Sequence, residues 1–259
     1  MRKPIIAGNW KMYKTIGAAI ELANGLKREF FKIEPKDIDI VLCPVFTCLS
    51  EVAEVVLSSN IGLGAQDVYW QDEGAFTGEI SAPMLKDAGC AYVIIGHSER
   101  RQFFGETNDT VNKKIKAALK SGLIPIVCVG ESLAQREANQ TFEVLSDHTR
   151  NGLAGLTEEE VAKIVIAYEP VWAIGTGKTA TSAQAQEAHK YIRDLLVKLY
   201  NSEIAEGIRI QYGGSVKPEN IEEIMAQPDV DGALVGGASL KVESFSEIVK
   251  RGLKVKVKK

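Results

Sequence analysis

Four polar side chains follow short apolar runs of the sequence, and their types suit proton transfer beside a carbonyl group. Asn9 and Lys11 come after the first run, His97 after the fourth and Glu169 after the sixth. Residues two apart in an extended chain point the same way, so the amide of Asn9 and the ammonium of Lys11 can face one pocket. We therefore treat these four residues as candidate catalytic groups.

Each group has a chemical role that its setting favours. Burial beneath apolar side chains raises the pKa of a carboxyl toward neutrality, which suits Glu169 as a general base. His97 precedes an expected helix start, where the positive end of the helix dipole favours a neutral imidazole. With Lys11 and His97 stabilising enediolate oxygens, the set predicts proton abstraction beside a carbonyl without cofactor or metal. Taken singly, a glutamate such as Glu169 is more often a surface residue, and a histidine such as His97 is more often structural. We expect His148 and His189 on helix surfaces.

Two glycine pairs near the chain end favour an anion site. Gly213-Gly214 precedes Ser215, and Gly236-Gly237 follows the last apolar run. Glycine lets backbone N–H groups approach phosphate oxygens closely, and parallel barrels often bind phosphate after strands seven and eight. The alternative for either pair alone is an ordinary turn.

The stretch from Pro170 to Ala180 has the composition of a mobile lid. Its apolar middle, Trp172-Ala173-Ile174, is costly to expose unless it covers something, and the exit contains glycines. The segment Gly175 to Thr179 resembles a nucleotide-binding loop, but Trp172 stands where that motif needs glycine. An ATPase is therefore excluded.

The elements that must position these groups repeat along the chain. Apolar runs without alternation are typical of strands covered on both faces, and helical periodicity fills most of the intervals. The runs are Ile5-Ala7, Ile38-Cys43, Ile61-Ala65, Tyr92-Ile95, Ile124-Val129, Ile164-Tyr168, Ile208-Tyr212 and Gly232-Val235. The pattern predicts a single α/β domain over residues 1–259, a (β/α)8 barrel of eight parallel strands ringed by helices. An open doubly wound sheet is the alternative, but Gly62-Leu63-Gly64 lacks the third glycine of a dinucleotide fold, with Asp67 in its place.

Four helices have recognisable signals. One apolar face is marked by Ile16, Ile20, Ala23, Leu26 and Phe30, and another by Val111, Ile115, Ala118 and Leu119. A third helix is expected from Ser182, as its N-cap, to Tyr200, and a fourth is expected to start at Lys217-Pro218-Glu219.

Composition excludes several function classes. The 259 residues carry 31 Lys and Arg against 34 Asp and Glu, and 45% are hydrophobic. This ordinary globular balance argues against disorder, and also against nucleic acid or an anionic membrane as the main partner. We expect a cytoplasmic protein with free thiols, no membrane span and a solvated basic tail around Lys254 and Lys256.

Several motifs occurring in order resemble those of the triosephosphate isomerase family over essentially the whole chain. They are Asn9-Trp10-Lys11-Met12, Gln66, Gly74-Ala75-Phe76-Thr77-Gly78-Glu79, Gly96-His97-Ser98-Glu99-Arg100-Arg101, the segment from Ala167 to Lys178, Gln211-Tyr212-Gly213-Gly214-Ser215-Val216 and Val235-Gly236-Gly237-Ala238-Ser239-Leu240. The resemblance implies a TIM barrel.

The resemblance also implies an activity, the interconversion of dihydroxyacetone phosphate and glyceraldehyde 3-phosphate in glycolysis and gluconeogenesis. It implies that Glu169 shuttles the proton between the two carbons and that His97 moves or shares protons at the carbonyl and hydroxyl oxygens. It also implies that Lys11 offsets negative charge and that Asn9 orients the substrate. Backbone N–H groups at Gly175, Ser215, Gly236 and Gly237 would hold the phosphate. The lid would hinge at Pro170-Val171-Trp172 and Lys178-Thr179-Ala180.

The resemblance further implies a homodimer formed through the loop from Gln66 to Glu79, with Thr77 reaching the neighbour's Asn9 and Lys11. Asp67 departs from the family, where asparagine is common, and no function is assigned to the tail from Arg251 to Lys259. The alternative enzyme is another phosphate-binding barrel, an isomerase or epimerase, which is not expected to combine Asn9, Lys11, His97 and Glu169. A non-enzymatic binding barrel would be expected to have a damaged base or anion site.

Overall fold

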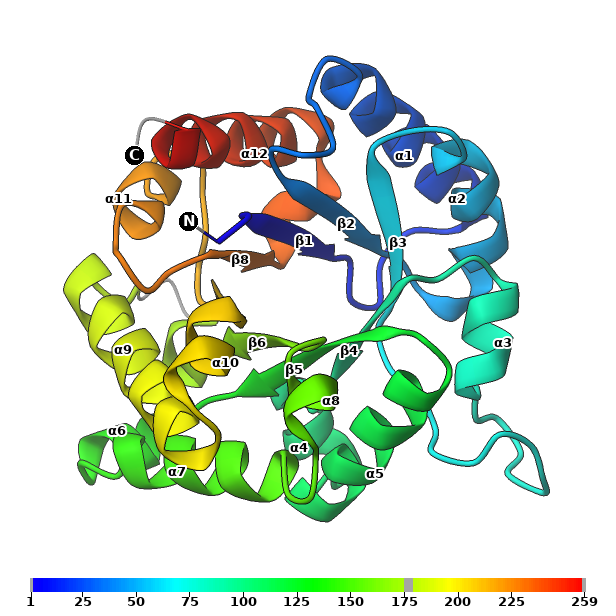
Figure 1. The fold of residues 1–259 in the computed structure, drawn as a ribbon. Helices are drawn as coiled ribbons and strands as arrows, with labels where there is room; N and C mark the ends of the chain where they lie inside the picture. The colour runs from blue at the N-terminus through cyan, green and yellow to red at the C-terminus, as the bar shows by residue number, and fades with distance from the viewer. Residues whose placement is uncertain (1, 175–178, 258–259) are drawn as a thin grey trace.

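The strands close into one barrel. A computed structural model describes residues 2–174 and 179–257 of the chain, and in it every neighbouring strand pair is parallel, with β1 pairing both β2 and β8 (Figure 1). The strands are β1 (Ile5–Asn9), β2 (Asp39–Cys43), β3 (Ile61–Ala65), β4 (Tyr92–Ile95), β5 (Ile124–Val129), β6 (Val165–Tyr168), β7 (Arg209–Tyr212) and β8 (Gly232–Val235). The predicted (β/α)8 barrel is confirmed, with strand ends shifted by one or two residues.

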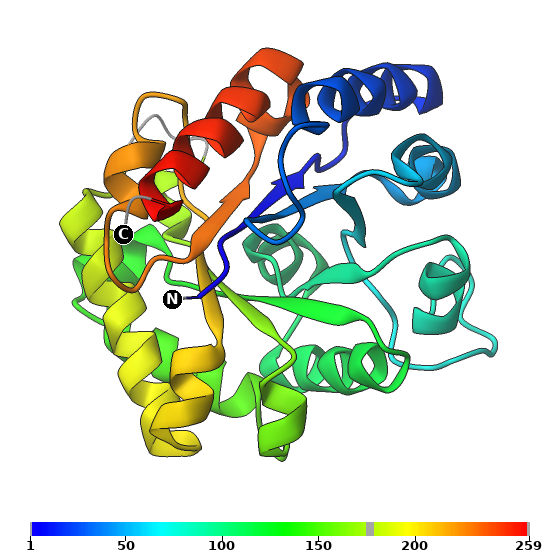
Figure 2. The same cartoon turned by 45° about the horizontal axis from the view of Figure 1, so that its top comes forward.

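Helices surround the barrel on its outside (Figures 1 and 2). The α-helices are α1 (Ile16–Phe30), α2 (Leu49–Val56), α3 (Ala82–Asp87), α4 (Ser98–Phe104), α5 (Asn108–Lys120), α6 (Leu133–Glu137), α7 (Thr141–Gly152), α8 (Glu158–Val161), α9 (Ser182–Leu199), α10 (Ser202–Gly207), α11 (Ile221–Met225) and α12 (Val242–Val257). Short 3₁₀ turns are η1 (Phe46–Cys48), η2 (Val171–Ala173) and η3 (Gly237–Leu240). None of the described helices is long and apolar enough to cross a membrane.

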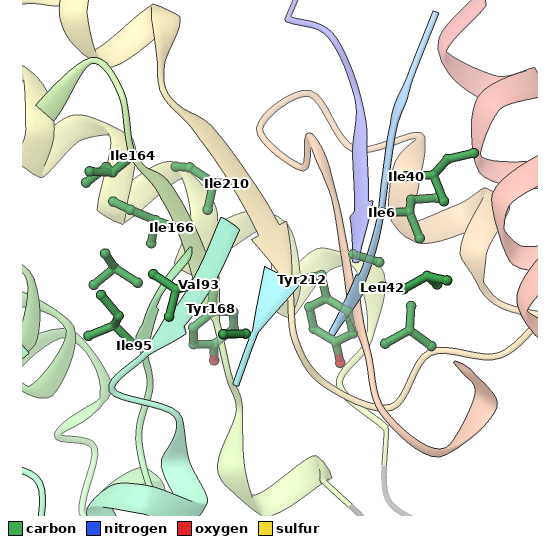
Figure 3. Packing of buried hydrophobic residues seen from close by; sticks show 14 of the residues in the cluster. Ile6, Ile40, Leu42, Val93, Ile95, Ile164, Ile166, Tyr168, Ile210 and Tyr212 are labelled. Carbon is green, nitrogen blue, oxygen red and sulfur yellow. The ribbon is translucent and has the colours of Figure 1, made fainter. Parts of the chain in front are cut away.

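The strands are apolar on both sides because each side faces a separate core. Side chains such as Ile6, Ile166 and Ile210 belong to the large cluster between strands and helices (Figure 3). Alternate residues, among them Ile5 and Val165, form a smaller buried cluster. Since successive strand residues point to opposite faces, this smaller cluster fills the barrel interior. The barrel is therefore a packed scaffold, with room for a site only at its ends.

Several helix details differ from the predictions. Ile16 is 44% exposed, and the buried face of α1 begins at Ala19 instead. Helix α9 is capped by Thr181, whose side chain accepts from the Gln184 N–H, and α11 starts only at Ile221 because a turn precedes it.

The expected solvated tail is wrong at Lys256. Residues 251–257 continue helix α12, in which the side chain of Lys256 is buried while Lys254 is exposed as expected.

Candidate active site

One cavity of about 380 Å³ gathers most of the predicted site residues. It lies at the carboxyl ends of the strands and is lined by Asn9, Lys11, His97, Glu169, Ser215, Gly236 and Gly237, among others. Gly175 lies outside the described residues. Three or more His, Cys, Asp or Glu side chains placed to hold a metal ion occur nowhere in the described ranges.

Glu169 directly follows β6 and is only 2% exposed. Its Oε1 lies 2.9 Å from Nε2 of His97, and its Oε2 accepts a hydrogen bond of 2.9 Å from the backbone N–H of Ser98. Burial raises the pKa of Glu169, but the pairing with His97, the Ser98 N–H and the charge of Lys11 outweigh it, so the pKa lies below its ordinary value. The expectation of a raised pKa is wrong for this arrangement because it omitted these partners.

Two glycines make room for Glu169. A Cβ added at Gly130, just after β5, would lie 1.8 Å from the carbonyl oxygen of Glu169. A Cβ at Gly213, just after β7, would lie 2.9 Å from Cγ of Glu169. Gly130 was not among the predicted site residues, and its only signal in the sequence is that it follows a strand.

His97 caps helix α4, as its position before a helix start predicted. Its Nδ1 accepts a hydrogen bond of 3.2 Å from the backbone N–H of Glu99. Burial lowers the pKa of His97, whereas the Glu169 carboxylate raises it, and the net shift is upward. The Glu99 N–H opposes a proton on Nδ1, so we assign a neutral ring that donates from Nε2 to Glu169.

Lys11 faces the same cavity as Asn9, but not for the predicted reason. Strand β1 ends at Asn9, and Lys11 is not extended: its φ is 53°, in the left-handed region. Such a conformation costs about 1–3 kcal/mol and persists only where neighbours hold it. The Lys11 N–H donates to Oδ1 of Asn9 at 3.0 Å, and Nε2 of Gln66 donates to the Lys11 carbonyl at 2.9 Å. The ammonium lies 2.5 Å from Oε1 of Glu99.

The predicted phosphate corner lies in the same cavity. Ser215, Gly236 and Gly237 line it together. The Oγ of Ser239 donates to the Gly236 carbonyl at 2.7 Å, and Nδ2 of Asn220 donates to the Ser215 carbonyl at 3.0 Å. These bonds fix the backbone of both glycine-containing turns.

The described part of the predicted lid packs against a buried acid. Ala173 is buried and Trp172 half-buried, so the apolar middle is largely shielded from solvent. The indole N–H of Trp172 donates to Oε1 of Glu131 at 2.9 Å, and the hydroxyl of Tyr168 donates to the same oxygen at 3.1 Å. Glu131 is fully buried, and the sequence analysis missed it.

A larger open cavity of about 850 Å³ adjoins the first one. It shares Glu169 and Ile174 with the first cavity and is also lined by Trp172 and His148. His148 is half-buried, and burial lowers its pKa to about 4.

The surface placement predicted for His189 is wrong. The side chain is fully buried, with its ring centroid 5.8 Å from that of Tyr168 and 6.4 Å from that of Tyr212. Burial lowers its pKa to about 3, so the ring is neutral.

Asp67, the departure noted in the loop after β3, has a defined place. Its carboxylate is buried and lies 2.7 Å from the Lys114 ammonium and 2.9 Å from the Arg100 guanidinium. Burial raises the pKa of Asp67 to about 6. A carboxylate at this position is accommodated by two cations.

Comparison with known proteins gives a consistent result. The sequence model of the family described as triosephosphate isomerase matches residues 4–252. A triosephosphate isomerase of Geotalea uraniireducens (strain Rf4) is 60% identical over 250 residues, which is 96% of this chain and 99% of that protein. Those of Trichlorobacter lovleyi (strain ATCC BAA-1151 / DSM 17278 / SZ) and Moorella thermoacetica (strain ATCC 39073 / JCM 9320) are each 58% identical over 96% of this chain, covering 99% and 98% of the respective proteins.

Proposed function

Because this chain belongs to the triosephosphate isomerase family, we propose that the cavity at the carboxyl ends of its strands is the active site, with Glu169, His97, Lys11 and Asn9 as the working groups. The enzyme interconverts dihydroxyacetone phosphate and glyceraldehyde 3-phosphate through an enediolate, a step of glycolysis and gluconeogenesis. The observation that supports the site is that these four side chains and the glycine turns line one cavity.

Glu169 is the base. Its carboxylate takes the proton from the hydroxyl-bearing carbon of dihydroxyacetone phosphate, the C–H electron pair forms the enediolate double bond, and the carbonyl π electrons move to oxygen. The proton then returns from Glu169 to the adjacent carbon. The former carbonyl oxygen takes the Nε2 proton of His97, and the hydroxyl on the first carbon gives its own proton back to that nitrogen as the aldehyde forms. The bonds of Glu169 to His97 and Ser98 lower its pKa, so exchanging them for substrate, with burial retained, makes it a stronger base.

His97 and Lys11 act on the oxygens. The Nε2 proton of His97 is available to the carbonyl oxygen once Glu169 has turned to the substrate, and the Lys11 ammonium offsets the charge that develops there. Asn9, which accepts the Lys11 N–H through its side chain, orients the substrate. The combination distinguishes this enzyme from other phosphate-binding barrel isomerases and epimerases.

The backbone N–H groups of Gly175, Ser215, Gly236 and Gly237 hold the phosphate. The lid would hinge at Pro170-Val171-Trp172 and at Lys178-Thr179-Ala180, of which Lys178 lies outside the described residues. Its closure would keep water from the enediolate, which would otherwise lose phosphate to give methylglyoxal.

The functional unit is a homodimer of single-domain subunits, residues 1–259, acting in the cytoplasm. Pairing of β1 with β8 joins the two ends of the chain in one barrel, which supports one domain. Met12 is 92% exposed, Tyr13 57% and Phe76 40%. Exposed apolar side chains on the loops after β1 and β3 favour an interface there, with Gln66 to Glu79 entering the partner and Thr77 approaching the partner's site.

A direct assay tests the activity. Purified protein is mixed with dihydroxyacetone phosphate and a chelator, and glyceraldehyde 3-phosphate is followed by proton NMR. We expect the two trioses to reach the same equilibrium ratio whether the reaction starts from dihydroxyacetone phosphate or from glyceraldehyde 3-phosphate. Absence of exchange with folded protein would overturn the assignment.

A further inference from the structure

A lysine outside the set of working groups lines the active-site cavity. Lys217 lies two residues after Ser215, in the turn that leads to α11, and it is a lining residue of the cavity that remains exposed to solvent. The roles assigned above do not use it.

The turn holds the stem of Lys217 in place. Its N–H donates to Oδ1 of Asn220 at 2.8 Å, and its carbonyl accepts from the N–H groups of Asn220 and Ile221, each at 3.2 Å. Asn220 also donates to the carbonyl of Ser215. The side chain of Asn220 thus holds the backbone of Ser215 and the backbone of Lys217 in a fixed arrangement.

Lys217 is a charged residue of the cavity wall that has no ion-pair partner among the residues the structure describes. Among the charged side chains of the cavity wall, Lys11 is paired with Glu99 and Glu169 with His97. Within residues 2–174 and 179–257, Lys217 forms no ion pair. The substrate carries a phosphate of about −1.5 to −2 charge at neutral pH, and Lys217 adds an unpaired positive charge to the wall of the cavity that would receive it.

We propose that Lys217 is a substrate-binding residue whose ammonium recruits the phosphate dianion to the turns at Ser215 and Gly236-Gly237. The proposal rests on the proposed function of this cavity. Because the ammonium is exposed, its contribution acts through solvent and is screened by salt. The Lys217 ammonium therefore contributes mainly to substrate binding, and so to KM.

The test compares Lys217→Met, Lys217→Arg and Lys217→Glu with Lys198→Met. Lys198 is also exposed, forms no ion pair with described residues, and lies near the end of α9, outside the lining of both cavities. The values of kcat and KM are measured for dihydroxyacetone phosphate at low and high ionic strength, and the inhibition constant of inorganic phosphate is measured in parallel.

We expect Lys217→Met to lower kcat/KM roughly three- to tenfold at low ionic strength, mostly through KM, and to weaken phosphate inhibition by a similar factor. Lys217→Glu should lose more, Lys217→Arg should retain most of the binding, and the deficit should shrink below about twofold at ~0.5 M salt. Lys198→Met should match the parent.

Equal kcat/KM and phosphate inhibition for Lys217→Met and Lys198→Met at both ionic strengths would overturn the role of Lys217. If the parent protein does not isomerise the substrate, the proposed function fails instead. Calorimetric titration of inorganic phosphate into the parent and Lys217→Met then still decides the matter, because unchanged affinity removes Lys217 from the site.

Discussion

At the residue scale, both carboxylate oxygens of Glu169 are engaged by protein groups in this structure, one by His97 and one by the Ser98 N–H. These bonds keep the carboxylate ionised, and the substrate must displace them. The carboxylate must then reach the substrate from the fixed end of β6, so proton abstraction depends on the length of its side chain.

Glu169→Asp withdraws the carboxylate by one methylene. We expect kcat to fall about 10²-fold with the fold intact, because a displacement of about 1 Å can cost that much. Turnover and thermal unfolding are measured together, with the exposed Glu203→Asp as a control. Unchanged turnover in Glu169→Asp would remove Glu169 from the role of base.

His97→Gln removes the ring that pairs with Glu169. Turnover should fall about 10²- to 10³-fold, since a donor to the developing oxyanion is lost. The pairing lowers the pKa of Glu169, so its loss lets burial raise that pKa, and the base becomes protonated at a higher pH.

The acidic limb of the pH profile of kcat/KM should therefore lie at higher pH in His97→Gln than in the parent protein. Titration of the substrate phosphate contributes equally to both profiles and so does not account for the difference. An unmoved limb in a folded variant would contradict the pairing. A variant that fails to fold would favour a structural role for His97.

At the element scale, the ends of β5, β6 and β7 approach one another so closely that glycine is required between them. Gly130 and Gly213 flank Glu169 from the two neighbouring strands. The position of the base is therefore set by three strand ends together, and not by β6 alone.

Gly130→Ala tests this packing. Its Cβ would fall 1.8 Å from the Glu169 carbonyl oxygen, so the backbone must shift, at a cost of about 1–3 kcal/mol or more. We expect a lower Tm and at least a tenfold loss of kcat. Gly207→Ala is the matched control because its Cβ would meet nothing within 4 Å; equal behaviour of the two variants would contradict the packing argument.

At the scale of the whole molecule, the exposed apolar side chains of the loops after β1 and β3 give the proposed dimer a test. Phe76→Asp places a charge in that surface and should shift the protein toward monomers, with loss of activity. Sedimentation measures the mass, and Phe31→Asp, at a side chain that is 73% exposed at the end of α1, is the control. Dimers that persist in Phe76→Asp would place the interface elsewhere.

The sequence predicted the barrel well because its strands are buried on both faces and so appear as uninterrupted apolar runs. It also placed Asn9, Lys11, His97 and Glu169 at strand ends, where parallel strands bring them together.

What it could not predict depends on contacts between distant segments. The buried position of His189 against Tyr168 and Tyr212, the pairing that lowers the pKa of Glu169, and the left-handed turn at Lys11 held by Gln66 have no local signal. Helical periodicity alone does not separate a buried histidine from an exposed one.

The pairing of Ile5 with Gly232 has a consequence for synthesis on the ribosome. Strand β1 emerges from the exit tunnel long before β8, its second neighbour, has been translated. The delay is roughly 10–50 s at ~5–20 residues per second. Until then the nascent chain presents an open sheet edge at β1, and such edges invite pairing with other polypeptides. The last strand translated is therefore what protects the first.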